Sequence, residues 1–356
     1  LEIMQSNGSR ITDFKYVSHK IYKGKPGLKG LPATYTESED EADTLELLLR
    51  DELLNVEMTL LYTIFQKENA IARSVRFENK GEEAYQITRA MSFCLDLPDC
   101  EYEWIQFSGA WGRERHVKTR MLEQGIQSVS STRGASSHFH NPFVMLKRPT
   151  ADEFQGEVMG FSLIYSGNFL AQAEVDTYHV TRMMIGINPF GFSWCLNPKE
   201  EFQTPEAVMV YSTDGMNGMS QTFHRLYRTR LARGYWRDRE RPILLNNWEA
   251  TYFDFTKEKL IEIAKNAKED GVELFVLDDG WFGSRCTETS GLGDWWPNQE
   301  RLPEGIKGLS KDIEALGLKF GLWFELEMTN KDSELYRNHP DWIIQTPGRH
   351  SSHGRK

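Results

Sequence analysis

Two adjacent carboxylates, Asp278 and Asp279, follow a run of apolar strand-forming residues at 272–277 and precede Trp281. Polar residues at the point where a strand gives way to a loop are typical of the ligand-binding edge of α/β folds. Aromatic rings stack on the C–H faces of a sugar, while carboxylates accept hydrogen bonds from its hydroxyls. The stretch therefore predicts a carbohydrate site, with the tryptophan expected at the surface.

Similar residues follow the strands predicted before and after this one. They are Trp248 and Glu249 after a strand at 243–247, and Trp323, Glu325 and Glu327 at the end of a strand at 318–324. Residues from several strand ends converge on one face in barrel active sites. The first strand is not followed by Gly-x-Gly-x-x-Gly, so a dinucleotide site lacks its phosphate cradle.

The elements that carry these residues alternate between strand and helix after Pro242. Helices are expected from Thr256, a plausible N-cap, to Gly271, then at 305–316 and at 333–338, with a fourth strand beginning at 342–344. Repeated units of this kind indicate parallel strands, in either a (β/α)₈ barrel or an open doubly wound sheet. The converging site residues favour the barrel. A barrel needs about 200 residues, more than follow Arg241, so the chain is expected to stop midway through it.

The first part of the chain instead predicts many short strands separated by turns. They are expected at 56–64, 72–77, 85–90, 160–165, 171–175, 181–187 and 207–211. Such a pattern is typical of a large antiparallel β-sandwich. A helix at 219–234 and a charged segment at 237–242 follow. We therefore expect a sandwich domain at 1–218, a helical linker at 219–240 and a partial catalytic barrel at 241–356.

Composition excludes several classes of partner. The net charge of −10 argues against nucleic acid and against an anionic membrane surface. No apolar run approaches the roughly 18 residues that span a bilayer. Four cysteines without CxxC spacing indicate reduced thiols in a cytoplasmic protein. His138 and His140 could share a face toward a metal, but hydrogen-bonded loop histidines are the favoured interpretation, and no metal is expected.

Several longer blocks resemble glycoside hydrolase family 36, the bacterial α-galactosidases. They lie at 108–111, 133–143, 165–169, 186–190, 202–206, 246–255, 277–283, 292–295, 321–325 and 352–355. The resemblance covers nearly the whole chain. It implies an N-terminal antiparallel β-supersandwich followed by the first half of a (β/α)₈ TIM barrel, in a chain truncated at both ends. The parent enzyme would be a cytoplasmic homo-oligomer that needs no cofactor.

The resemblance also implies the chemistry and the roles of individual residues. It implies a retaining α-galactosidase that hydrolyses terminal α-galactosyl groups of raffinose-type sugars, with two catalytic aspartates expected beyond Lys356. Asp278 and Asp279 would accept hydrogen bonds from galactose hydroxyls. Trp248 and Trp323 would line the same site, and Arg355 would donate to a hydroxyl or hold a carboxylate. Where the family usually has a proline, this chain has Leu326, which frees a backbone N–H and widens the range of φ.

Two other interpretations stay open. The chain could be a non-catalytic galactoside-binding or assembly module that a separate chain completes. Alternatively, Asp278 could form a catalytic pair with Glu325 or Glu327. Neighbouring residues on one strand end point in different directions, so Asp278 and Asp279 do not easily flank one anomeric carbon together.

Overall fold

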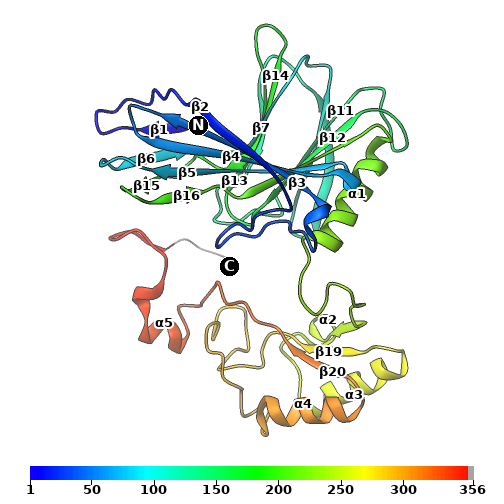
Figure 1. The fold of residues 1–356 in the computed structure, drawn as a ribbon. Coiled ribbons are helices and arrows are strands. Elements are labelled where there is room, and N and C mark those ends of the chain that lie inside the picture. The colour runs from blue at the N-terminus through cyan, green and yellow to red at the C-terminus, as the bar shows by residue number, and fades with distance from the viewer. Residues whose placement is uncertain (352–356) are drawn as a thin grey trace. The chain divides into compact units, whose positions relative to one another are not determined.

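The structure, a computed structural model, describes residues 1–351 and divides into two compact units, Leu1–Arg237 and Asp238–Lys356. The first unit consists mostly of antiparallel strands, and the second contains three short parallel strands and most of the helices (Figure 1). None of the helices in residues 1–351 has the length and apolar character needed to cross a bilayer.

The first unit is built on a ten-stranded antiparallel sheet. Its strands run in the order β2-β3-β4-β5-β17-β12-β11-β8-β9, and β16 also pairs with β5. Their bounds are β2 Lys15–Lys23, β3 Asp43–Asp51, β4 Val56–Phe65, β5 Ala70–Asn79, β8 Glu103–Ala110, β9 Arg113–Met121, β11 His140–Lys147, β12 Val158–Ile164, β16 Glu201–Gln203 and β17 Glu206–Ser212. The predicted antiparallel sandwich is confirmed in this unit.

Two smaller sheets complete the first unit. A four-stranded sheet has the order β10-β13-β14-β7 and a three-stranded sheet the order β1-β6-β15. Their bounds are β1 Glu2–Met4, β6 Tyr85–Arg89, β7 Met91–Leu97, β10 Gly125–Ser130, β13 Phe169–Val175, β14 Thr181–Ile187 and β15 Trp194–Leu196. The 3₁₀ turns are η1 Glu39–Glu41 and η2 Gln66–Glu68. All seven short strands predicted from alternation therefore exist, with bounds equal to the predicted ones or within two residues of them.

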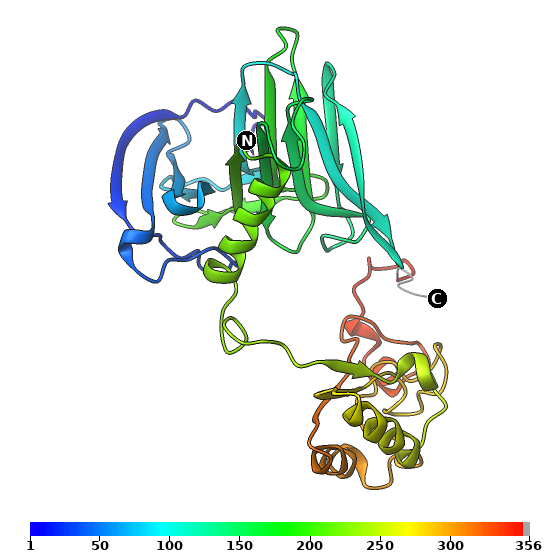
Figure 2. The same ribbon diagram turned by 90° about the vertical axis from the view of Figure 1, so that its right-hand side faces the viewer.

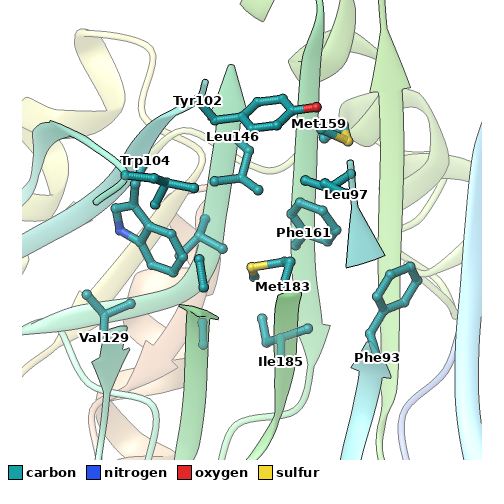
Figure 3. Packing of buried hydrophobic residues seen from close by; sticks show 14 of the residues in the cluster. Phe93, Leu97, Tyr102, Trp104, Val129, Leu146, Met159, Phe161, Met183 and Ile185 are labelled. Atoms are coloured by element: carbon teal, nitrogen blue, oxygen red, sulfur yellow. The ribbon is translucent and has the colours of Figure 1, made fainter. Parts of the chain in front are cut away.

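The main core lies between the ten-stranded and four-stranded sheets (Figure 3). Strand β12 contributes side chains to two cores, one on each face of the sheet. Met159 and Phe161 belong to this core, whereas Val158 and Ile164 belong to the core on the opposite face of the sheet. Successive side chains of a strand point to opposite faces, so a strand buried on both sides is apolar almost throughout.

Helix α1, Gly215–Arg230, covers that opposite face, where it packs on β12 and β17 (Figure 2). Met219, Phe223 and Leu226 are its buried apolar side chains. The helix approaches closely because Gly160 has no side chain; a Cβ there would lie 2.6 Å from Met219 Sδ and 2.6 Å from Phe223 Cε2. Most of α1 falls within the linker predicted at 219–240, and the helix packs on the sheet of the first unit.

The second unit has a parallel sheet of three strands in the order β18-β19-β20. Its elements are β18 Leu244–Asn246, α2 Trp248–Thr251, α3 Lys257–Glu269, β19 Leu274–Leu277, α4 Gly305–Ala315, β20 Lys319–Leu322, α5 Glu334–Asn338 and the 3₁₀ turn η3 Pro340–Trp342. Helices α3 and α4 lie on one side of the sheet (Figure 1), where Leu260, Phe275 and Leu309 share a core. Within residues 1–351, β18 and β20 each pair with β19 alone.

Local signals place these helices. Thr256 caps α3 as expected, since its hydroxyl accepts a hydrogen bond from Lys259 N at 3.3 Å.

The expected strand at 342–344 is wrong, because Pro340 opens a 3₁₀ turn and the ring of Trp342 stacks on His339 with centroids 4.0 Å apart. For the half barrel predicted at 241–356, the described residues show a three-stranded parallel sheet with its helices, and the barrel itself stays a prediction.

Candidate functional site

The carboxyl ends of the three parallel strands lie next to one another. Asn246 pairs with Val276, and Leu277 pairs with Leu322, so each strand ends at about the same level of the sheet. Trp323 continues the alignment, since its N–H donates to Leu277 O at 3.0 Å. Trp248, Asp278 and Trp323, predicted from three separate stretches, therefore follow three neighbouring strand ends.

Asp278 is half-buried and held by three hydrogen bonds. Its Oδ2 accepts from Asn246 Nδ2 at 2.5 Å, and its Oδ1 accepts from the backbone N–H of Asp279 at 2.7 Å. Its own N–H donates to Asn247 Oδ1 at 2.8 Å. The carboxylate is thus fixed in direction while part of it stays accessible to a donor such as a sugar hydroxyl.

Asn246 and Asn247 have different roles because they are neighbours at a strand end. Asn246 is exposed, and its Oδ1 accepts from Trp248 N at 2.7 Å. Asn247 is completely buried, and its Nδ2 donates to Thr251 Oγ1 at 2.8 Å. One amide orients the carboxylate and starts α2, while the other joins α2 to the end of β19.

Trp248 is half-buried, at the start of α2. Its ring meets Tyr252 and Phe253 edge-on, with centroids 5.2 and 5.1 Å away. Tyr252 has a left-handed φ of 46°, which turns the chain after the short helix. Its hydroxyl donates to Glu249 Oε2 at 3.1 Å, and this hydrogen bond raises the pKa of Tyr252. Glu249 is therefore engaged with a tyrosine beside the site.

Asp279 is buried, and its carboxylate is held by Arg285. Arg285 Nη2 donates to Oδ2 at 2.7 Å, and Nε reaches Oδ1 at 2.9 Å and Oδ2 at 3.1 Å. Only 6% of Asp279 and 4% of Arg285 is exposed. The two aspartates therefore differ, since Asp278 is bonded to neutral amides and Asp279 to a buried guanidinium.

Trp281 lies in the core, which corrects the expectation that it would be at the surface. It is 2% exposed, and its Nε1 donates to Trp323 O at 3.1 Å. Its ring also meets Trp295 and Phe324, with centroids 6.2 and 5.2 Å away. An indole N–H needs an acceptor when buried, and here that acceptor is the backbone at the end of the third strand. Trp281 thus supports the backbone next to the half-buried Trp323.

The remaining predicted residues lie at the edge of this arrangement. Glu325 is half-buried, and Glu327 is exposed. Leu326 lies in a turn and is 73% exposed. Arg355 lies outside the described residues.

The loop after β19 has a defined internal structure. Gly280 has φ +93°, and a Cβ on it would lie 2.8 Å from Arg301 Nη1 and 2.9 Å from Phe253 Cδ1, so only glycine fits. Asp294, 1% exposed, accepts from the N–H groups of Glu334 and Leu335, both at 3.0 Å. This aspartate caps α5 and so ties the loop to the segment that follows the third strand.

The histidines considered above as metal ligands have other partners. His140 Nδ1 lies 2.9 Å from Ser108 Oγ, and burial, followed by the charge of Arg120, lowers the pKa of His140. The ring of His138 lies against that of Phe139 at a tilt, with centroids 4.6 Å apart. All four cysteines are free thiols. His140 is thus hydrogen-bonded at the start of β11, while His138 lies in the turn before that strand.

The arrangement provides fixed hydrogen-bond acceptors beside aromatic rings, which suits a polyhydroxylated ring such as a sugar. Arg285 is the residue that sequence reasoning missed. Asp279 could have pointed to such a partner, because a carboxylate expected in a buried position needs a cation beside it. The arginine six residues later in the same loop was the nearest candidate.

Two family models together match nearly the whole chain. Residues 1–197 match the glycosyl hydrolase family 36 N-terminal domain, and residues 201–356 match the melibiase family. The junction between the two matches falls just before β16.

Among curated proteins, the chain is 58% identical to the alpha-galactosidase AgaA of Geobacillus stearothermophilus, over 99% of the chain and 49% of that protein. It is 46% identical to the alpha-galactosidase Mel36A of Lactobacillus acidophilus, over 98% of the chain and 47% of that protein. A crystal structure of an AgaA variant in complex with raffinose matches with a TM-score of 0.97, 58% identity, and coverage of 99% of this chain and 49% of that one. The chain spans about half the length of the curated relatives it matches.

Proposed function

Because the chain belongs to glycoside hydrolase family 36, we propose that it forms the galactose-recognising part of a retaining α-galactosidase. The enzyme would hydrolyse terminal α-galactosyl groups of raffinose-type oligosaccharides. The observation that supports this most directly is the Asp278 carboxylate, fixed at a strand end between Asn246 and Asp279. The related AgaA variant has been crystallised in complex with raffinose.

The proposed galactose-binding residues are Trp248, Asp278, Asp279, Trp323 and Arg355. Asp278 and Asp279 would accept hydrogen bonds from ring hydroxyls, and the two tryptophans would contact C–H faces. The carboxylate of Asp279 already accepts three hydrogen bonds from Arg285, so few of its roughly four lone-pair sites remain for a hydroxyl. We therefore expect Asp278 to be the main acceptor.

Catalysis would use two aspartates outside this chain. A retaining mechanism needs two carboxyl groups about 5–5.5 Å apart, one as nucleophile and one as acid and base, and it needs no cofactor. We propose that β18, β19 and β20 are the first strands of a (β/α)₈ barrel, which is supported by their parallel pairing with α3 and α4 on one side. Residues 1–218 would be the supersandwich domain, 219–240 the connection and 241–356 the partial barrel of a cytoplasmic homo-oligomer.

Titration of the chain with methyl α-galactoside, followed by tryptophan fluorescence, tests the recognition role. We expect saturable binding and weaker binding of methyl α-glucoside, which differs only at C4. Asp278→Asn should weaken galactoside binding about tenfold or more, since hydrogen bonds to charged groups contribute about 1.5–3 kcal/mol. Asp254→Asn is the matched control, because the Asp254 side chain is 99% exposed. Equal affinity of wild type and Asp278→Asn would contradict the assignment.

Activity assays separate the catalytic alternatives. If the catalytic pair lies outside the chain, the purified polypeptide should release no nitrophenol from p-nitrophenyl α-galactoside. Release that is lost in Glu325→Gln or Glu327→Gln would instead support a pair with Asp278. Galactoside binding without hydrolysis, in a protein whose full gene lacks a Lys-Trp-Asp strand end, would favour the binding or assembly module.

A further inference from the structure

All three guanidinium nitrogens of Arg285, in the loop that follows β19, donate hydrogen bonds. Nε and Nη2 donate to the carboxylate of Asp279. Nη1 donates to Glu288 O at 2.9 Å, to Ser290 O at 3.0 Å and to Asn330 Oδ1 at 2.9 Å. One buried side chain thus joins the aspartate, its own loop and the segment after β20.

The far end of this network is itself held in place. Asn330 Oδ1 also accepts from Leu292 N at 3.0 Å, and Asn330 N donates to Leu292 O at 3.0 Å. The guanidinium therefore cannot turn without breaking bonds at both ends. A planar fork of fixed donors defines the plane of the carboxylate it binds, which a single ammonium does not.

The two aspartates of the site are mechanically linked. The N–H of Asp279 donates to Asp278 Oδ1 at 2.7 Å, so the backbone of the second aspartate orients the carboxylate of the first. Fixing the Asp279 side chain fixes the direction of that N–H. Arg285 consequently acts on both predicted galactose ligands, although only Asp279 contacts it.

We propose that Arg285 is a positioning residue for galactose recognition and acts through the carboxylate of Asp279. This inference rests on the proposed function. The fork occupies one edge of the carboxylate, so hydroxyl donors reach only the remaining lone pairs and from a restricted set of directions. Arg285 thereby sets which arrangement of hydroxyls the site accepts, in addition to stabilising the loop.

A double-mutant cycle with Arg285→Lys and Asp279→Asn tests this. Lysine keeps the charge but cannot form the fork. We expect Arg285→Lys to weaken methyl α-galactoside binding roughly tenfold and to reduce its preference over methyl α-glucoside. In the Asp279→Asn background the same substitution should change affinity less than about twofold, because the carboxylate it positions is gone.

Arg337→Lys is the matched control, since Arg337 forms exposed ion pairs with Asp332 and Glu334 in the same unit. It should bind like the wild type. Urea unfolding of each variant separates loss of binding from loss of folding. A purely structural arginine would lower the unfolding free energy while the folded fraction keeps wild-type affinity and sugar preference, and that result overturns the proposal.

If Arg285→Lys does not fold, Asp279→Asn is compared with the double variant Asp279→Asn/Arg285→Gln, which leaves no unpaired buried charge. Equal affinity of these two supports the proposal, whereas a loss of more than about fivefold on adding Arg285→Gln contradicts it. Absence of galactoside binding by the wild type would defeat the proposed function together with this inference. Wild-type binding that Arg285→Lys leaves unchanged would defeat the inference alone.

Discussion

The side-chain amide of Asn246 donates to Asp278 Oδ2 at 2.5 Å, from the end of β18 to the end of β19. The next residue, Asn247, accepts the N–H of the same aspartate from the buried side. Two consecutive asparagines therefore hold Asp278 by its side chain and by its backbone. Their different burial allows recognition and stability to be tested separately.

Asn246→Ala should weaken methyl α-galactoside binding about three- to tenfold and change the unfolding free energy by less than about 1 kcal/mol, since the residue is exposed. Asn247→Ala should cost about 1–3 kcal/mol, because it leaves the N–H of Asp278 without its acceptor and removes one donor to the Thr251 hydroxyl, which keeps its own bonds to backbone carbonyls. Fluorescence titration and urea unfolding measure the two effects. The same profile in both variants would show that the two amides are not separate in function.

The first unit contains a buried ion pair, which we expect to contribute to its stability. Lys25 Nζ lies 2.6 Å from Glu206 Oε2, with side chains 3% and 2% exposed, and Thr34 donates twice to Oε1. Glu206→Gln keeps the shape but leaves the ammonium buried without a counter-charge, which should cost about 3–5 kcal/mol in urea unfolding. Asp96→Asn, which breaks the exposed pair with Arg182, should cost less than about 1 kcal/mol. A similar small loss in both variants would contradict this assignment.

Gly160 should not tolerate a side chain. An added Cβ would lie 2.6 Å from Met219 Sδ and from Phe223 Cε2, so Gly160→Ala must displace these two side chains or α1 itself. We expect the free energy of unfolding, measured by heat or urea, to fall by about 1–3 kcal/mol. Gly27→Ala, where an added Cβ meets no atom within 4 Å and φ is not positive, should be neutral or slightly stabilising. A neutral Gly160→Ala would mean that the helix packs more loosely than described.

His140 predicts a pH dependence of stability. Burial lowers its pKa in the folded protein below the unfolded value, so the unfolded chain binds more protons once the pH falls through about 6.5. The folded state therefore loses stability as the pH falls below that value, and above it the histidine contributes no slope. His140→Asn can still hydrogen-bond Ser108 but does not titrate. Urea unfolding between pH 5 and 8 should show a shallower acid-side loss for His140→Asn, and parallel curves would contradict the prediction.

Alternation of apolar residues was a good guide to the sandwich. Strand β14, Thr181–Ile187, was predicted with its observed bounds because Met183 and Ile185 point into the main core. Strand β9, Arg113–Met121, could not be found this way, since all its residues are exposed and charged residues dominate it. Strand β9 has no buried face, and its extended conformation depends on its pairing with β8.

The strand ends that carry the candidate site could be predicted from the sequence, but the contacts between its residues could not. The predicted strand ends indicated that Trp248, Asp278 and Trp323 lie near one another, because parallel pairing aligns the ends of neighbouring strands. The burial of Trp281 and the pairing of Asp279 with Arg285 depend on how the loop after β19 folds back on itself. Loop conformation has no period that a sequence pattern can show. The roles assigned to the site residues stay predictions.

Arg285 holds its loop through the carbonyl oxygens of Glu288 and Ser290, so the fixed atoms are ones that every amino acid carries. The side chains at 286–289 are exposed and take no part in that attachment. Their identity is therefore free to drift between homologues, or to be randomised in a designed library, without moving the aspartate that the loop supports. We expect new surface chemistry beside the site to be acquired most readily at these four positions.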